Sequence, residues 1–130
     1  MTNEEVVKVL VESSDRDWDT VKSLFGSRKY PEALFFVHLS IEKLLKALHY
    51  FKNDTHPMPI HKLTKLATDA GFGGTELDME ELNEITRFNI SARYDDYKRS
   101  FFRLATLKYA TKWMEKGDKL RLKIKEQMKT

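Results

Sequence analysis

Apolar residues recur every three or four positions along most of the chain, which is the spacing that places them on one face of an α-helix. The first such stripe runs from Val7 to Phe25, behind Thr2 or Asn3, either of which can cap the start of a helix. Gly26 predicts its end, because glycine tolerates the backbone conformation that closes many helices. No segment alternates between apolar and polar residues as a half-buried β-strand does, so we expect helices throughout.

Two further helices are expected in the middle of the chain. Pro31 suits a first helical position, and apolar residues at helical spacing continue from there to about Phe51. Residues 53–59 contain two prolines and are expected to form a connection. A shorter apolar stripe over 63–70 is closed by Gly71, which predicts a short third helix.

The glycine-rich segment 71–74 follows no predicted strand, so we expect it to reverse the chain rather than bind phosphate. A fourth helix is expected over about 78–88 or 89. We assign Asp78 as its cap and expect a hydrophobic contact between Leu77 and Leu82.

The last helix is expected from about Lys98 to the end of the chain, and it is longer than a compact bundle of this size must cover. These elements predict an all-α fold, an antiparallel up-and-down helical bundle of four or five helices. At 130 residues with 41% hydrophobic content, the chain fits one domain over 1–130. Its basic end, about 115–130, is expected to project from the bundle or to pair with a second chain.

Composition excludes several classes of site. The chain has no cysteine, which removes disulfides, thiolate metal sites and cysteine nucleophiles and fits a cytoplasmic location. No apolar run approaches the length of a membrane span, so we expect no membrane insertion. His38 and Glu42, four residues apart, are too few ligands for a structural metal site, and we expect neither metal nor cofactor.

Charge is unevenly distributed. The segment from Lys98 onward holds eleven Lys and Arg against three Asp and Glu, a net charge of +8, which leaves −5 for residues 1–97 out of a total of +3. A local positive field attracts anions such as nucleic acid or an acidic protein. The alternative is a solvated helix face without a partner.

Polar residues interrupt the apolar second helix. Ser40, Glu42 and Lys43 lie among large apolar residues, where a charge needs a partner from another helix or from a ligand. A simpler interpretation pairs Glu42 with Lys46 on a wet surface and gives His38 no function.

A second polar cluster follows the fourth helix. Arg87, Arg93 and nearby backbone N–H groups are able to surround phosphate oxygens, because guanidinium groups bind them with two hydrogen bonds. The alternative is that Asn89 ends the fourth helix while Arg93 and Tyr94 pack against the following turn.

Three sequence strings resemble the HEPN domain family. They are Ala33-Leu-Phe-x-x-His-Leu-Ser-x-Glu-Lys-x-Leu-Lys-Ala47, Ile60-His-Lys-Leu63 and Asn89-x-x-x-Arg93-Tyr94-Asp95. The resemblance implies a nucleotide- or RNA-related helical bundle that forms a homodimer, with a ligand cleft at or near the dimer interface. It also implies a minimal nucleotidyltransferase as partner protein, in toxin–antitoxin pairs or in fused chains.

Many members of this family are metal-independent ribonucleases with an Arg, four to six residues and then a His. Arg87 can be the first element, but the position after five intervening residues is Arg93, and no histidine follows His61. Arginine stays protonated and cannot act as a base, although it can stabilise charge on phosphate. We expect His61 to be a cap or to make an interhelical hydrogen bond.

Three hypotheses follow. We favour a noncatalytic HEPN-type module that binds a nucleotide or RNA. The alternatives are a degenerate metal-independent ribonuclease of the toxin type, with Arg87 as candidate catalytic residue, and a structural dimerising adaptor. The residues expected to bind the ligand are Ser40, Glu42, Lys43, Arg87, Asn89, Arg93 and Tyr94.

Overall fold

The computed structural model describes residues 1–90 and 95–129. The described residues form helices and connections without a strand. The helices are α1 (Asn3–Gly26), α2 (Tyr30–Lys52), α3 (Leu63–Ala70), α4 (Glu76–Thr86), α5 (Asp95–Leu104) and α6 (Leu107–Glu126). The expected all-helical bundle is therefore confirmed, with one helix more than the four or five predicted.

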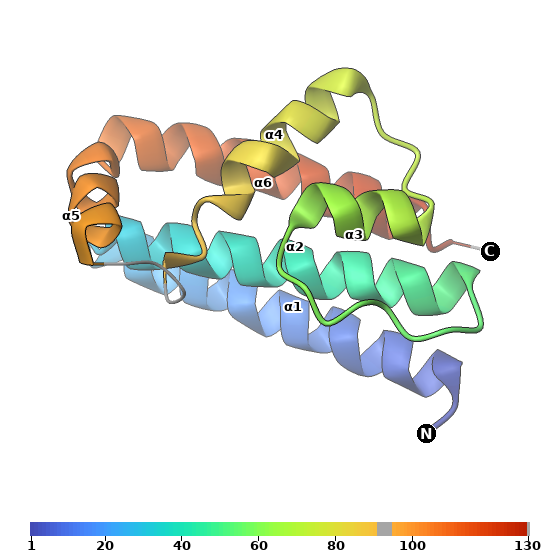
Figure 1. Ribbon diagram of the computed structural model, residues 1–130. Helices are drawn as coiled ribbons and strands as arrows, with labels where there is room; N and C mark the ends of the chain where they lie inside the picture. The colour runs from blue at the N-terminus through green and yellow to red at the C-terminus, as the bar shows by residue number, and fades with distance from the viewer. Residues whose placement is uncertain (91–94, 130) are drawn as a thin grey trace.

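The extra helix arises from a break in the last predicted one. Thr106 has an extended backbone and accepts a hydrogen bond from the backbone N–H of Tyr109, so it caps the start of α6. Apolar spacing continues across the break, so the sequence predicts a single helix there. As a result, α5 crosses one end of the bundle and α6 turns back along it (Figure 1).

Not all consecutive helices alternate in direction. α1 and α2 form an antiparallel hairpin, and α4 runs antiparallel to α6 (Figure 1). α2 and α6 run in the same direction, since Gly117 approaches Val37 and Arg121 bonds Ser40. α2 and α3 also run in the same direction, since Lys52 at the end of α2 bonds Gly71 at the end of α3. This consecutive pair departs from the predicted up-and-down order, because the 53–62 connection carries the chain back along α2 before α3 begins.

One apolar core joins the helices. α2 lies at its centre and buries residues along nearly its whole length. The largest fully buried apolar side chains are Phe88, Leu34, Ile41, Leu44, Leu45, Leu48, Leu63, Leu82, Ile85, Leu120 and Ile124. Burial of this kind contributes about 1.5–3 kcal/mol for each such side chain, so the core stabilises the whole bundle.

The start of α4 differs from the prediction. Thr75, not Asp78, is the N-cap, and the Asp78 carboxylate accepts a hydrogen bond from the Thr75 N–H at 2.8 Å in a capping box. Leu77 is 59% exposed and therefore makes no hydrophobic staple with Leu82. The Asp78 carboxylate also binds Lys123 of α6, which ties the start of α4 to that helix.

The basic end of the chain does not project over its described part. Ile124 is fully buried, and the Gln127 side chain exchanges two hydrogen bonds of 2.8 Å with the backbone of Gly73. The glycine segment 71–74 thus reverses the chain, as expected, and also holds the end of α6. Among the described residues, no helix has the length and apolar content needed to cross a membrane.

Candidate nucleic-acid interface

Ser40 lies inside the bundle rather than at a ligand site. It is 0% exposed, and its Oγ accepts a 2.6 Å hydrogen bond from Arg121 Nε and lies 2.8 Å from Ser14 Oγ. Arg121 also bonds Asp15 at 2.7 Å, and its guanidinium lies over the ring of Trp18. The network joins α1, α2 and α6, so a ligand in solvent does not reach Ser40 in this arrangement.

Lys43 faces α1. Its Nζ lies 2.8 Å from Asp17 Oδ2 and 2.7 Å from Ser13 Oγ, and the side chain is 29% exposed. The expectation that a charge among apolar residues needs a partner is met by another helix. Lys43 therefore helps to clamp α1 against α2.

Glu42 is a buried carboxylate whose neighbours are two histidines and one lysine. Its Oε1 lies 2.8 Å from His61 Nδ1 and 3.7 Å from His38 Nε2, and its Oε2 lies 3.1 Å from Lys46 Nζ. Burial raises the pKa of Glu42, but the hydrogen bonds from His61 and Lys46 outweigh that effect and hold the pKa below its ordinary value. Glu42 is therefore an ionised anchor, and the Glu42–Lys46 pair is not on a wet surface.

This anchor reaches the end of α4. His61, which makes the expected hydrogen bond to another element, lies two residues before the start of α3. The N–H of Leu63 donates to Thr86 Oγ1 at 3.1 Å, and Thr86 is the last residue of α4. Through these hydrogen-bonded neighbours Glu42 helps to hold the end of α4, and Arg87 directly follows that end.

Arg87 is the most exposed of the predicted ligand-binding residues that the structure describes. Its side chain is 49% exposed, and its Nη1 donates to both carboxylate oxygens of Glu84 at 2.9 and 3.2 Å. The Nε approaches the hydroxyl of Tyr97 at 3.4 Å. Hydrogen bonds to Tyr97 and Glu84 raise the pKa of the guanidinium above its already high ordinary value, so Arg87 is a permanent cation.

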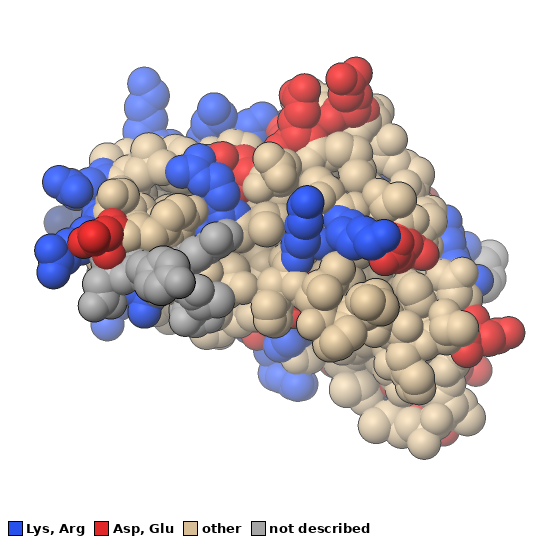
Figure 2. Space-filling model, in the orientation of Figure 1, with Lys and Arg blue, Asp and Glu red and all other residues tan. Residues whose placement is uncertain are grey.

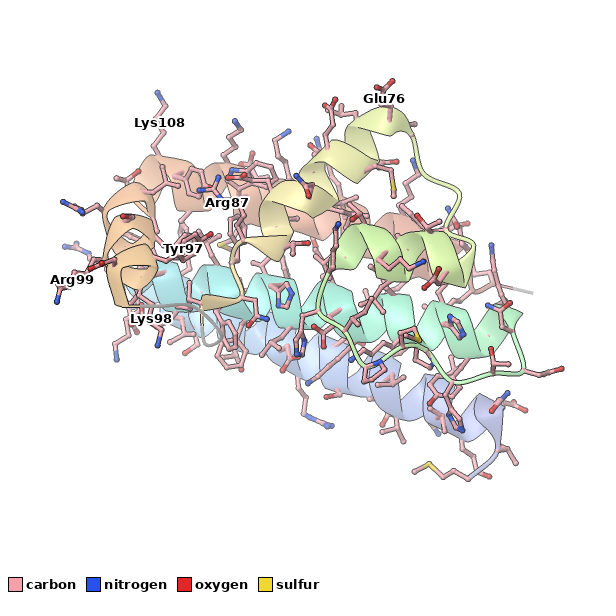
Figure 3. The ribbon with its side chains drawn as sticks, in the orientation of Figure 1. Glu76, Arg87, Tyr97, Lys98, Arg99 and Lys108 are labelled. Carbon is pink, nitrogen blue, oxygen red and sulfur yellow. The ribbon has the colours of Figure 1, made fainter. Side chains whose placement is uncertain are left out.

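Two tyrosines hold the Arg87–Glu84 pair in place. Tyr97 on α5 donates its hydroxyl to the carbonyl oxygen of Arg87 at 3.1 Å, and Figure 3 shows it pointing back toward that residue. Tyr109 on α6 donates to Glu84 Oε2. Burial raises the pKa of Tyr109, and the neighbouring Glu84 carboxylate raises it further, which keeps the phenol protonated. The Arg87 guanidinium is therefore positioned from three helices.

The remaining predicted residues have different settings. Asn89 is 8% exposed and lies beside the fully buried Phe88. Arg93 and Tyr94 lie outside the described residues. The structure thus places Arg87 and Asn89 at one end of the bundle and separates them from Ser40 and Lys43, which face α1.

Cationic side chains gather at the same end of the molecule. Figure 2 shows Lys and Arg around the end formed by α5 and the start of α6. Two open grooves lie there and share Arg103. The charged residues that line them are Lys98, Arg99, Arg103, Lys108 and Lys112. This cationic end lies beside the Arg87 site, because Tyr97 of α5 bonds Arg87 directly.

Sequence reasoning missed Glu84, Tyr97 and Tyr109. The three-residue spacing of Glu84 and Arg87 on a helix was available as a signal for that ion pair. The two tyrosines approach through tertiary packing and leave no such signal. Among the described residues, no group of three or more His, Cys, Asp or Glu side chains is arranged to hold a metal ion.

The described residues thus form an all-helical bundle with a positioned arginine and a cationic end. The HEPN domain family model matches residues 7–127, which is nearly the whole chain, and the chain belongs to the HEPN domain family. Searches of curated proteins and of solved structures give no match.

Proposed function

We propose that this chain is a cytoplasmic HEPN-type module that binds a nucleotide or RNA without cleaving it, at the end of the bundle where α4 finishes and α5 begins. The observation that carries the proposal is the setting of Arg87. Its guanidinium is half exposed and is oriented by Glu84 and Tyr97. Its Nη2 makes no hydrogen bond to the described residues, so donors remain for a phosphate.

Electrostatics support an anionic ligand at this end. The cations of α5 and the start of α6 lie at the same end of the molecule as Arg87 and attract phosphate, which is the main source of affinity for nucleic acids. Arg93 and Tyr94 belong to the proposed site on sequence grounds. Glu42 and Lys43 serve it indirectly, by fixing the bundle on which Arg87 stands.

Binding without cleavage is supported by the residue types. The position at which many family members carry a histidine is Arg93, which cannot accept a proton from a 2′-hydroxyl. The His61 side chain is 60% exposed, but its Nδ1 contacts the Glu42 carboxylate. This contact gives His61 a structural role in holding the connection before α3. Stabilisation of phosphate charge, and not proton transfer, is the chemistry that these side chains provide.

The proposal is tested by anisotropy titration of a fluorescent single-stranded RNA, with mononucleotides as competitors. Arg87→Gln removes the charge, and Arg16→Gln on the exposed side of α1 is the matched control. We expect Arg87→Gln to weaken binding roughly 10-fold or more, as hydrogen bonds to charged groups allow, and Arg16→Gln to leave it unchanged. Equal RNA affinity of the unaltered chain and both variants would exclude Arg87 from the binding site.

Cleavage is tested separately, with the same RNA incubated in EDTA. We expect intact RNA. Cleavage that is abolished in Arg87→Ala would instead establish a metal-independent ribonuclease of the toxin type. A further loss in His61→Gln would then assign His61 as its base.

Partners form the last part of the proposal. The resemblance in sequence supports a homodimer and a minimal nucleotidyltransferase as partner protein. Analytical ultracentrifugation of the purified chain tests the dimer. Co-expression with the product of the neighbouring reading frame, followed by affinity purification of the tagged chain, tests the partner. A monomer that recovers no nucleotidyltransferase would contradict both expectations.

A further inference from the structure

Helix α5 has two chemically different faces. Phe101 is 3% exposed and packs in the core, where its ring lies 5.5 Å from that of Phe88. The next residue, Phe102, is 48% exposed and lines an open groove with Lys98, Arg99 and Arg103. Lys98 and Arg99 precede Phe102 by four and three residues and so share its helix face, and Arg103 lines the same groove.

The groove continues onto α6. Arg103 lines it and also lines a second groove formed by Leu104, Thr106, Lys108, Tyr109 and Lys112. We call the surface made by Lys98, Arg99, Phe102, Arg103, Lys108 and Lys112 the α5–α6 strip. Figure 3 shows Arg99 and Lys108 pointing outward from this end of the molecule.

The cations of the strip make no ion pair with the described part of the chain. Elsewhere on α6 several lysines are paired, as Lys116 is with Glu81 and Lys123 with Asp78. A row of cations without carboxylate partners leaves a positive potential for an external polyanion. Lys112 in addition lies near the ring of its neighbour Trp113, at 5.6 Å from the centroid.

The exposed ring identifies the kind of polyanion. Single-stranded nucleic acid is bound by cations that follow its backbone and by aromatic rings that stack on its bases. A duplex keeps its bases stacked on one another, and the carboxylate side chains of an acidic peptide have no aromatic face to match Phe102, whereas every base of a single strand has one. Insertion of α5 into a membrane is disfavoured because its other face is buried through Phe101.

We infer that the α5–α6 strip binds single-stranded nucleic acid, with one base stacked on Phe102 and the neighbouring phosphates on Lys98, Arg99 and Arg103. This inference rests on the proposed function and adds the form of the ligand to it. Arg87 stands on the inner side of α5, where Tyr97 holds it, and the strip lies on the outer side. A strand on the strip can therefore continue toward Arg87 around this one helix.

The stacking step is tested with two oligomers of equal charge. One is a single-stranded RNA, and the other is an abasic phosphodiester of the same length that offers phosphates without bases. We expect Phe102→Ala to weaken binding of the RNA roughly 5- to 150-fold, which corresponds to the loss of one stacked base. The abasic oligomer should bind the variant and the unaltered chain equally.

Controls separate stacking from loss of structure. Phe102→Tyr keeps a ring and should restore RNA binding, whereas Leu122→Ala removes a 60% exposed apolar side chain far along α6 and should change nothing. Circular dichroism checks that each variant is helical. An equal loss for the RNA and the abasic oligomer would overturn the stacking assignment.

The cationic step is tested by salt dependence. The triple variant Lys98→Gln, Arg99→Gln and Arg103→Gln should weaken both oligomers and reduce the slope of log affinity against log salt by about 2, since each phosphate contact on a single strand contributes about 0.7. The matched triple variant Lys8→Gln, Arg16→Gln and Lys22→Gln removes the same charge from α1 and should keep the slope.

The inference and the proposed function fail in different ways. If Arg87→Gln weakens RNA binding while Phe102→Ala and the α5 triple variant do not, the proposed function stands and the strip is excluded. Preference for duplex RNA over single strands, or binding to anionic vesicles with none to RNA, would also exclude the strip. Single-stranded RNA and DNA of one sequence, compared directly, distinguish the two sources of the strand.

Discussion

The Tyr97 hydroxyl donates to the carbonyl oxygen of Arg87 at 3.1 Å and lies 3.4 Å from the Nε of the same residue. Tyr97 belongs to α5, and Arg87 follows the last residue of α4. The pair therefore fixes the guanidinium relative to the helix that carries the α5–α6 strip. Binding of a ligand that contacts both Arg87 and the α5–α6 strip is therefore expected to depend on the Tyr97 hydroxyl.

Replacing Tyr97 by Phe should uncouple Arg87 from α5. The change keeps the ring and removes the hydroxyl, so we expect a loss of about 0.5–1.5 kcal/mol in the free energy of unfolding. RNA affinity should fall several-fold because the guanidinium loses its position. Urea denaturation and anisotropy titration measure the two effects. Tyr50→Phe, which removes a hydroxyl that bonds His56 on an exposed surface, is the control and should leave RNA binding unchanged.

Arg121 should be a main stabilising residue of the bundle. It is 5% exposed, and its bonds to Ser40 and Asp15 join α6 to α2 and α1. Arg121→Met fills similar space without these bonds, and we expect a loss of about 2–3 kcal/mol in the free energy of unfolding. Lys119→Met, at an exposed position of the same helix, should cost less than about 0.5 kcal/mol. Equal urea midpoints for the two variants would contradict this role.

Stability should fall as the solution is acidified. Burial lowers the pKa of His38 below 6.5, and the pKa of Glu42 is below 4.5 because its hydrogen bonds outweigh burial. In both cases the unfolded chain binds protons at a higher pH than the folded chain does. The stability from His38 is therefore present above pH 6.5 and lost below it, and that from Glu42 is lost as the pH falls below 4.5.

Glu42→Gln isolates the second effect. At pH 7 the variant should be less stable by about 1–3 kcal/mol, since it loses a charged acceptor for His61 and Lys46. The difference from the unaltered chain should shrink as Glu42 becomes protonated in acid. Urea denaturation between pH 7 and about pH 2.5 measures it, because the loss begins below pH 4.5, and Glu12→Gln at an exposed position is the control. A difference that stays constant over this range would contradict the assignment.

Two glycines should respond in opposite directions to an added methyl group. A Cβ at Gly117 would lie 2.8 Å from Val37 Cγ1, so Gly117→Ala should force α6 away from α2 and cost about 1–3 kcal/mol. A Cβ at Gly26 would meet no atom within 4 Å, so Gly26→Ala should be neutral or stabilising by up to about 1 kcal/mol. Thermal denaturation of both variants measures the contrast.

Much of the helical framework could be predicted from the sequence. Apolar spacing, Thr2, Pro31 and Gly71 mark the bounds of the first three helices, because these signals act over a few residues. Local signals also explain the two errors at helix starts. Thr75 and Thr106 are the caps, whereas the capping-box pattern that begins at Asp78 and the apolar spacing that continues past Thr106 favour other helix starts.

The candidate site was predictable only in part. Arg87 stands out in the sequence, and the charge asymmetry from Lys98 onward indicates where an anion is attracted. Ser40 and Lys43 have the sequence features of ligand contacts, yet their partners are Arg121 and Asp17. A polar residue in an apolar stripe predicts that a partner exists and leaves open whether that partner is a ligand or another helix.

By itself the sequence determined the class of fold and the family, because helical periodicity and short motifs are properties of neighbouring residues. The tertiary structure alone decided which polar groups meet. Tyr97 reaches Arg87 and Arg121 reaches Ser40 only after helices far apart in the chain have packed. The same packing buried Phe101 and left Phe102 among the cations of α5, a difference that adjacent and chemically identical residues cannot reveal.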